Sequence, residues 1–237
     1  MSDAGLSELR ASQPRAFQPL ARSPITPAPP VVVLAGWEVS GRQANADAAA
    51  GGTGLTITDC TPLAKVQLRA LVGGRAAAAI GVRFGRAARD PAGTLVVGSG
   101  PGEWLLLAAP GQAPDLESGL ASSALQASGE HVTWVDLTHG RALIRLTGSC
   151  SVSVLARTCG IDLSDEITPN GAAFRTSVAS VATDIIRDDL GSIRSYLLHC
   201  ERSSGDYLFR SLLRAGAEFG IEIDGFRLPS APRPLGI

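Results

Sequence analysis

The sequence predicts an α+β fold in which helices pack on mainly antiparallel sheets. Two observations lead to this class. Short segments in which apolar and polar residues alternate recur along the chain, and this period of two is typical of half-buried strands. Residues 139–220 are predicted to run strand, helix, three strands and helix, and strands also dominate the first half. Sheets covered by a few helices are therefore the expected architecture.

Residues 1–52 are predicted to be a Pro/Ala-rich amino-terminal arm and linker. Residues 1–30 contain several prolines and few large apolar side chains, so we expect an extended arm that packs little of itself. The apolar stretch VVVLAGW, residues 31–37, is expected to dock as a strand or onto a partner. Residues 38–52 are expected to form a loop or a short helix. A mobile tail and an arm ordered by a partner both remain open for this region.

The folded body is predicted to cover residues 53–223, followed by a Pro-rich carboxy-terminal tail at 224–237. Its first half is expected to consist of strands with one helix over 114–127. The expected strands are LTITD (55–59), AKVQLRAL (64–71), AAAAIGVRF (76–84), the two strands of GTLVVGSGPGEWLLLAAPG (93–111) and HVTWVDL (131–137).

The second half is predicted to begin with a break at Thr138–Gly140, because a strand from 131 to 147 would be unusually long. The strand RALIRLTG follows, with Ala142, Ile144 and Leu146 on one face. Ser149 is placed to cap a helix through 158. The apolar face expected for that helix consists of Val152, Leu155, Ala156 and Cys159.

Three strands, at 172–179, 180–187 and 192–200, are expected before a last helix at 203–220. Ser203 and Asp206 match a capping box at its start, and Gly220 suits its end. The buried stripe expected for this helix consists of Leu208, Leu212, Ala215 and Phe219.

Composition and charge are ordinary for a globular protein. Of the 237 residues, 45% are apolar and 18% are charged, so the chain can bury a core without disulfides or metals. The formal net charge of −1 produces no field that would attract nucleic acid or anionic lipid. Neither a nucleic acid nor a membrane is therefore an expected partner.

The cysteines and the amino terminus predict a cytoplasmic location. Cys60, Cys150, Cys159 and Cys200 are scattered without a CxxC pair, and we expect buried thiols in a reducing compartment. The first residues lack the basic and apolar regions of a secretion signal. The longest apolar runs, such as PPVVVLAGW, are too short to span a bilayer.

Residues 135–163 hold a concentration of reactive side chains that does not form a predicted catalytic unit. A Ser-His-Asp arrangement needs its base within hydrogen-bond reach of both partners. Asp136 and His139 are three apart near a strand end, so an extended backbone directs them to opposite faces. Ser149 lacks the strand–GxSxG–helix context of a nucleophile. We interpret Ser149 as a helix cap and His139 as a turn or interface residue.

Other reactive motifs also favour structural interpretations. Cys150 and Cys159 lie nine apart on one predicted helix, which directs them to opposite sides and excludes a shared metal or disulfide within it. The glycine-rich GSGPGEW (98–104) opens a strand, whereas a phosphate-binding loop opens a helix. His131 and His199 lie at strand ends without paired ligands. The acidic stretches DEITPNG and RDDLG are interpreted as solvated turns.

Four segments in sequence order resemble the gamma subunit of heterotetrameric sarcosine oxidase. They are GPGEWLLLA (100–108), VDLTHGRALIRLTG (135–148), VLARTCGIDL (154–163) and YLLHCERSSGDYLFRSLLRAGAEFG (196–220). The family's hairpin, Asp-x-Ser/Thr, Cys-Gly-x-Asp-Leu and Arg-Ser features fall on Gly100–Leu105, Asp136–Thr138, Cys159–Leu163 and Arg202–Ser203. The similarity covers about residues 93–222.

The resemblance implies a fold similar to that of the folate-binding aminomethyltransferase of glycine cleavage. It also implies a supporting role beside alpha, beta and delta subunits in a complex that oxidatively demethylates sarcosine to glycine, with tetrahydrofolate as one-carbon acceptor. FAD, FMN, NAD and tetrahydrofolate are then expected on the partner subunits. We expect no catalytic, cofactor-binding or metal-binding residue on this chain. PPVVVLAGW (29–37) and FRLPSAPRPLGI (226–237) are the expected interface segments.

Two other functions remain as alternatives. A free-standing folate-binding protein of the same superfamily would need a pocket with a carboxylate aimed at the pterin. A serine or cysteine hydrolase would need Ser149 or Cys150 to be reactive.

Overall fold

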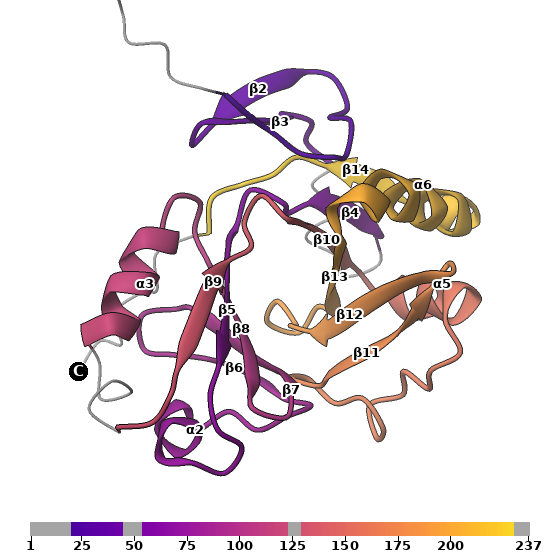
Figure 1. The fold of residues 1–237 in the computed structure, drawn as a ribbon. Helices are drawn as coiled ribbons and strands as arrows, with labels where there is room; N and C mark the ends of the chain where they lie inside the picture. Colours follow the sequence, from indigo (N-terminus) through magenta and orange to yellow (C-terminus); the bar gives the residue numbers. More distant parts are fainter. Residues whose placement is uncertain (1–19, 45–53, 123–128, 230–237) are drawn as a thin grey trace, which may run out of the picture.

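The computed structural model describes residues 20–44, 54–122 and 129–229, which form three sheets (Figure 1). The smallest sheet comes from the amino-terminal region and has the strand order β1-β3-β2. Its strands are β1 (Ala21–Arg22), β2 (Val31–Leu34) and β3 (Trp37–Ser40). β1 is parallel to β3, and β2 is antiparallel to it.

The larger sheets contain the strands predicted for the folded body, in mainly antiparallel pairing. The six-stranded sheet has the order β11-β12-β13-β10-β4-β14, and the five-stranded sheet has the order β6-β7-β8-β5-β9. The strands of the first are β4 (Thr56–Asp59), β10 (Arg141–Thr147), β11 (Ala173–Val178), β12 (Val181–Arg187), β13 (Ser195–Glu201) and β14 (Glu222–Asp224). The strands of the second are β5 (Ala64–Arg69), β6 (Ala87–Arg89), β7 (Leu95–Gly100), β8 (Glu103–Ala108) and β9 (Thr133–Asp136).

The two larger sheets are joined along two seams. On one side, β4 continues through a turn into β5 and β9 continues through a turn into β10, so one antiparallel ribbon passes through both sheets. On the other side, the Ala87 N–H donates to the Gly171 carbonyl, and the Ala173 N–H donates to the Gly85 carbonyl. Because both seams are hydrogen-bonded, the inner faces of the sheets are held opposite each other.

Helices cover the outer faces of both sheets (Figure 1). α5 (Ser151–Thr158) and α6 (Gly205–Gly216) pack on the six-stranded sheet, and α6 is flanked by the 3₁₀ turns η1 (Arg202–Ser204) and η2 (Ala217–Phe219). α2 (Arg75–Ile80) and α3 (Ala113–Ser122) pack on the five-stranded sheet. This layered α+β arrangement confirms the predicted fold class, and the order strand, helix, three strands, helix is confirmed for residues 139–220.

Apolar cores fill the spaces between these layers. Leu55, Ile144, Leu155 and Leu208 belong to the core under α5 and α6. A second core lies between the sheets, where Leu105 and other buried residues of the five-stranded sheet meet residues of the six-stranded one. Ile144 of β10 faces the first core and its neighbour Leu143 faces the second. Both faces of this strand are therefore buried, whereas only one had been predicted to be apolar.

The strand predicted for residues 76–84 is wrong, because most of this segment belongs to the helix α2. Its alanines are the best helix formers. The Glu130 carboxylate accepts the N–H groups of Arg75 and Ala76 at 2.7 and 3.0 Å, which satisfies donors that the first turn leaves free. Gly81 ends the helix in the left-handed conformation, with φ of 70°.

Both predicted helix caps are wrong. α5 begins at Ser151 with Cys150 in the cap position, and no side chain caps it. α6 likewise starts without a side-chain cap, because Asp206 binds the Thr26 N–H and Arg210 instead. These caps fail because the cap position shifts by one residue and a distant segment offers Asp206 a partner.

The buried faces of both helices agree only partly with the predictions, since Ala215 and Phe219 of the predicted α6 stripe are half-buried. In α6, Leu208 and Leu212 are fully buried, as predicted, and Gly220 ends the helical region with φ of 66°. In α5, Leu155 and Cys159 are buried, but Val154 is buried where Ala156 had been expected and Ala156 is exposed. Ser151, Val154 and Leu155 therefore form the buried face, at i, i+3 and i+4, which is shifted by one position from the predicted face.

The expectation that residues 1–30 pack little of themselves is wrong for residues 20–30, whereas a strand within 31–37 is confirmed by β2. Ile25 lies in the core under α6, while Trp37 and Val39 lie in the core between the sheets. Residues 38–40 belong to β3, where a loop or short helix was expected. Residues 1–19, 45–53, 123–128 and 230–237 lie outside the described residues, and they include 123–127 of the expected helix and part of the expected tail.

Candidate functional site

Polar side chains line part of the inner face between the two larger sheets, beside the apolar core. Along β13, Leu197 belongs to this core, and His199 follows on the same face. Asp184 has the same relation to Ile186 on β12, and Arg175 to Ala173 on β11. The side chains of these polar residues thus share one inner face, although they come from three strands.

Asp184 is the centre of this inner-face cluster. Its carboxylate accepts hydrogen bonds from Arg175 Nε at 2.7 Å and Arg175 Nη2 at 3.1 Å, and it lies 3.0 Å from His199 Nδ1. The three residues are direct neighbours in the sheet, since Arg175 pairs with Asp184 and Asp184 pairs with His199. The register of the strands therefore builds a carboxylate–imidazole pair anchored by a bidentate arginine.

Burial and hydrogen bonds set the charges in the cluster. Burial lowers the pKa of His199, although the nearby Asp184 opposes this shift. Burial also opposes ionisation of Asp184, but hydrogen bonds from His199 and Arg175 outweigh it, so the pKa of Asp184 is lowered. A neutral His199 donates its Nδ1–H to the Asp184 carboxylate, which leaves Nε2 as an acceptor. Nε2 is buried and has no hydrogen-bond partner among the described residues.

The five-stranded sheet contributes a second carboxylate to the inner face. Glu103 lies on β8 on the same face as the core residue Leu105. Its carboxylate accepts Gln67 Nε2 at 3.2 Å and lies 3.0 Å from Arg69 Nε. Asp184 and Glu103, one from each large sheet, are therefore each bound by an arginine of this chain.

Lys65 is a third feature of the inner face, and the sequence interpretation overlooked it. It lies on β5 with its side chain fully buried, and its Nζ donates to three backbone carbonyls. One signal was present in the sequence: all other Lys/Arg positions of the chain are arginines, so Lys65 is its single lysine.

The reactive residues of 135–163 are separated, as the sequence analysis predicted. His139 stacks on Trp37 with ring centroids 4.9 Å apart and an angle of 9° between the rings. Asp136 accepts the Thr138 N–H at 2.7 Å. Ser149 Oγ lies 3.9 Å from Cys150 Sγ, at the start of α5. His139 thus belongs to a turn and to the contact with the amino-terminal sheet.

The cysteines are all free thiols. Burial raises the pKa of both Cys60 and Cys200 to about 11, so they are protonated at neutral pH. Cys159 is also buried, whereas Cys150 is half-buried. Within the part of the chain that the structure describes, no group of His, Cys, Asp and Glu could hold a metal ion.

The glycine-rich segment 98–104 forms a hairpin turn, as predicted, because it connects β7 to β8. His199, which the sequence analysis placed at a strand end without a partner, instead lies within β13 and pairs with Asp184. The partner is fifteen residues away in the sequence, so spacing along one element could not indicate it.

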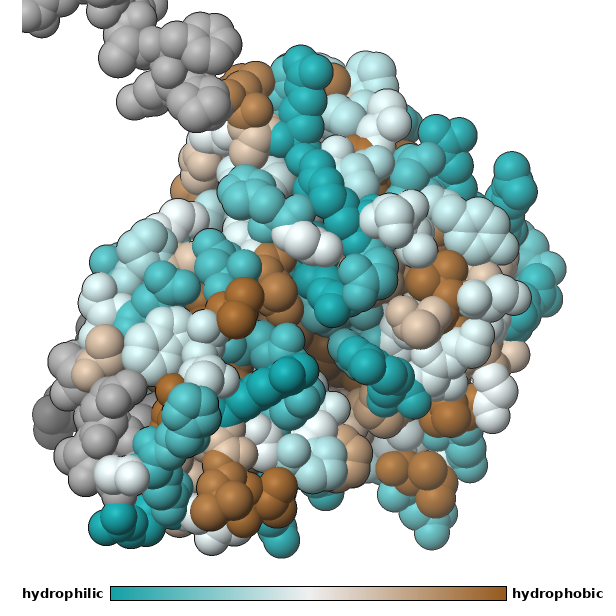
Figure 2. All heavy atoms as spheres, in the orientation of Figure 1, coloured by the Kyte–Doolittle hydropathy of each residue, from teal (hydrophilic) through white to brown (hydrophobic). Residues whose placement is uncertain are grey.

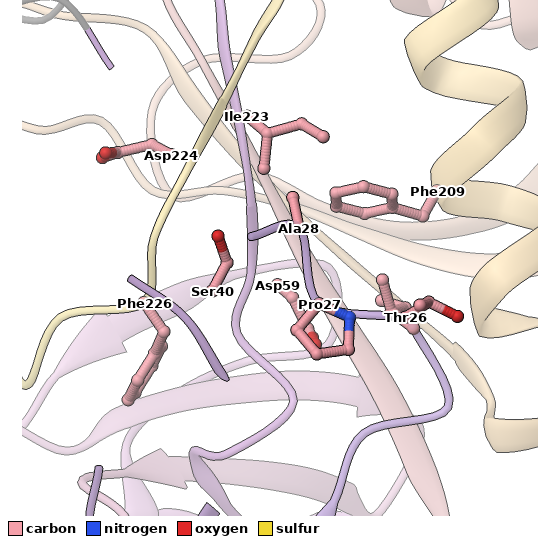
Figure 3. A pocket seen from close by; sticks show the side chains of 10 residues that line it. Thr26, Pro27, Ala28, Ser40, Asp59, Phe209, Ile223, Asp224 and Phe226 are labelled. Atoms are coloured by element: carbon pink, nitrogen blue, oxygen red, sulfur yellow. The ribbon is translucent and has the colours of Figure 1, made fainter. Parts of the chain in front are cut away.

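A small pocket lies between the amino-terminal segment, α6 and the segment after β14 (Figure 3). Phe209 reaches from α6 toward Ala28 and Ile223, whereas the Asp224 carboxylate points away and accepts the Ala44 N–H at 3.1 Å. Asp59 lies in the wall, and burial raises its pKa. The pocket has room for about one water molecule, which is too little for a substrate.

No protein-family model and no curated protein matches the sequence. Among solved structures, a chain of heterotetrameric sarcosine oxidase from Corynebacterium sp. U-96, in complex with pyrrole 2-carboxylate, is similar with a TM-score of 0.59. It is 29% identical, over 72% of this chain and 87% of that chain. The glycine cleavage system aminomethyltransferase T from Bartonella henselae has a TM-score of 0.58 at 15% identity, over 82% of this chain and 55% of that chain.

This chain has the fold of those two proteins. The predicted fold class, including its similarity to the folate-binding aminomethyltransferase fold, is therefore confirmed. In the described residues, no helix is long and apolar enough to cross a membrane.

Proposed function

We propose that this chain is a supporting, gamma-type subunit of a heterotetrameric, sarcosine-oxidase-like flavoenzyme of the cytoplasm. Its partners are alpha, beta and delta subunits, which carry FAD, FMN, NAD and tetrahydrofolate. The complex demethylates sarcosine or a related N-methyl amine. This chain holds the large subunits in register and supplies no reacting group.

One similarity carries the proposal. The match to a sarcosine oxidase chain combines 29% identity with coverage of 87% of that chain, whereas the aminomethyltransferase match is 15% identical and covers 55% of its chain. Since the alignment covers a larger share of the oxidase chain than of this one, the matched oxidase chain is shorter than 237 residues. That size suits a small subunit of the heterotetramer.

The inner-face charges support a structural role over the alternative of a free-standing folate-binding protein. A pterin site needs a carboxylate free to bind the ring. Asp184 is held by Arg175 and His199, and Glu103 is held by Arg69 and Gln67. These residues do not fit tetrahydrofolate, so we assign no folate step to this chain.

The exposed valines of β2 are the proposed contact with a large subunit. The side chains of Val31, Val32 and Val33 are 50%, 43% and 62% exposed, and Figure 2 shows hydrophobic side chains over β2 at the surface. In the ladder with β3, the Gly41 N–H donates to the Pro30 carbonyl. By alternation, Val31 and Val33 then direct their backbone N–H and C=O groups away from β3. An apolar, uncharged edge of this kind is normally covered.

The second expected interface segment, residues 226–237, was wrongly predicted to be available from its first residue. Phe226 is buried in the core between the sheets and is not available to a partner. Leu228, two residues later, is 49% exposed and remains a proposed contact.

The first experiment is a gentle purification of the tagged chain from its own host, followed by native mass measurement and a visible spectrum. We expect two much larger chains and one smaller chain to co-purify with flavin absorbance and sarcosine turnover. A colourless chain that purifies alone would contradict the proposal. Tight folate binding by that isolated chain would then favour the alternative.

A paired substitution tests the contact surface. Val33→Lys places a charge on the edge of β2 and is expected to lower the recovery of large subunits at least about tenfold, because a charge must be desolvated in the interface. Val135→Lys is the matched control, since Val135 is 57% exposed on β9, the edge strand of the five-stranded sheet. Equal recovery with both variants would remove β2 from the interface.

A further inference from the structure

Lys65 occupies the point where the chain passes from one sheet to the other. Its Nζ donates to the Thr61 carbonyl at 2.7 Å and to the Leu63 carbonyl at 2.8 Å, both in the turn between β4 and β5. The same nitrogen donates to the Thr138 carbonyl at 3.3 Å, in the turn between β9 and β10. One side chain therefore connects the two turns of the ribbon that joins the sheets.

The chemistry of this position selects lysine. An ammonium has three N–H donors on a single compact atom, which matches three converging carbonyl oxygens, whereas guanidinium donors are spread over a planar fork. The chain's other Lys/Arg positions are all arginines, and its one lysine is fully buried. The single lysine in the composition and the three carbonyls around its Nζ are independent observations, and both indicate that this position requires an ammonium group.

We propose that Lys65 is a proton-sensitive pin: the ammonium holds the β9–β10 turn to the β4–β5 turn, and the neutral amine releases the Thr138 carbonyl. A neutral amine has two N–H donors and a lone pair, so it can satisfy two of the three carbonyls. The bond to Thr138 is the longest of the three and is the one given up.

The release is local, because other bonds keep the turns together. The Lys65 backbone N–H donates to Thr138 Oγ1 at 3.0 Å, and the Leu137 N–H donates to the Lys65 carbonyl at 2.7 Å. The same turn carries His139, which stacks on Trp37 of the amino-terminal sheet. Loosening of the β9–β10 turn would therefore first disturb the stack between His139 and Trp37.

Burial, opposed by the nearby carboxylates, places the exchange of the Lys65 proton near neutral pH. Burial lowers the pKa of Lys65 to about 7. Asp59, at the end of β4, and Asp136, at the end of β9, act in the opposite direction, with Asp59 the stronger, while the Cys60 thiol is neutral at this pH. Arg202 of η1 lowers the pKa further. His199 of β13 also faces Lys65, and it is neutral at this pH because burial lowers its own pKa.

The single lysine allows a direct test on the full-length chain, in the assembly in which it purifies. Lysine labelled with ¹³C at Cε gives one lysine signal from this chain, and its shift is followed from pH 5 to pH 11. We expect a midpoint near 7 in the folded protein and near 10.5 in urea. A folded-state midpoint at the urea value would overturn the proposal.

Amide hydrogen exchange tests the mechanical part. Between pH 6 and pH 8.5, after correction for the intrinsic rate, protection of the Leu137 and Gly140 amides is expected to fall about fivefold, the effect of losing one hydrogen bond. Protection of the β13 amides serves as the reference and stays constant. Lys65→Met, which cannot be protonated, is expected to show the low protection at every pH. If Lys65→Met does not fold, the exchange of the wild-type chain still tests the proposal. Protection of the Leu137 and Gly140 amides that does not change with pH would contradict it.

Discussion

Replacing Trp37 by alanine tests whether the amino-terminal sheet is an integral part of the fold. The indole is 5% exposed and lies in the core between the large sheets, so nearly its whole side chain contributes. Truncating a buried tryptophan costs about 3–5 kcal/mol of unfolding free energy. Within this loss, the stack on His139 contributes about 0.5–1.5 kcal/mol. For a chain of this length, the melting temperature is expected to fall by about 10 °C.

Urea denaturation followed by circular dichroism measures the loss, and limited proteolysis tests whether residues 20–44 become accessible. Val33→Ala is the matched control, because Val33 lies on the neighbouring strand with its side chain 62% exposed, and its effect should stay within about 0.5 kcal/mol. A double-mutant cycle with His139→Ala isolates the stack. A loss below about 1 kcal/mol for Trp37→Ala would refute the reasoning, because it would mean that the sheet is not docked.

Three further perturbations follow from the described contacts. Asp184→Asn is expected to cost about 2–4 kcal/mol at pH 7 in urea denaturation, since it removes a buried charge that its partners need. Because the folded-state pKa of Asp184 is lowered, this cost should shrink as the pH falls below about 4, and a constant difference down to about pH 3 would contradict it. With Lys65, the unfolded state binds the extra proton between about 7 and 10.5, so stability should rise with pH across that window by up to about 1.4 kcal/mol per unit, and Lys65→Met should lack this slope. Gly148→Ala is expected to lose at least about 2 kcal/mol, because φ is 127° and a Cβ would collide with the Gly54 carbonyl, whereas Gly160→Ala, with nothing within 4 Å of the added atom, should be nearly neutral.

Local sequence patterns predicted the elements whose signals are contained within themselves. The hairpin of β7 and β8 was predicted because two apolar segments flank a Gly/Pro turn. The buried positions of α6 were predicted because Leu208 and Leu212 repeat at the helical period. The break between β9 and β10 followed from the limit on strand length. In each case, the residues that decide the structure lie within about twenty positions of each other.

The errors occurred where a distant residue supplied the deciding contact. α2 is stabilised by Glu130, which lies 54 positions after the Ala76 amide that it binds. Trp37 becomes a core residue because His139 and the inner-face core, far along the chain, surround it. The cap predicted for α6 failed for a similar reason, since Asp206 binds the distant Thr26 N–H, whereas the α5 cap failed because the helix begins one residue later than expected.

The sequence by itself determined the fold class, most of the strands, the last helix and the separation of Asp136, His139 and Ser149 within residues 135–163. Its short-range periodicity encodes which face of each element is buried, and that is enough to set the layers. Only the tertiary structure decided that Asp184, Arg175 and His199 meet, and that Lys65 connects two turns. Strand register and the crossing of the ribbon place these side chains together, and both depend on contacts between positions that no local pattern relates.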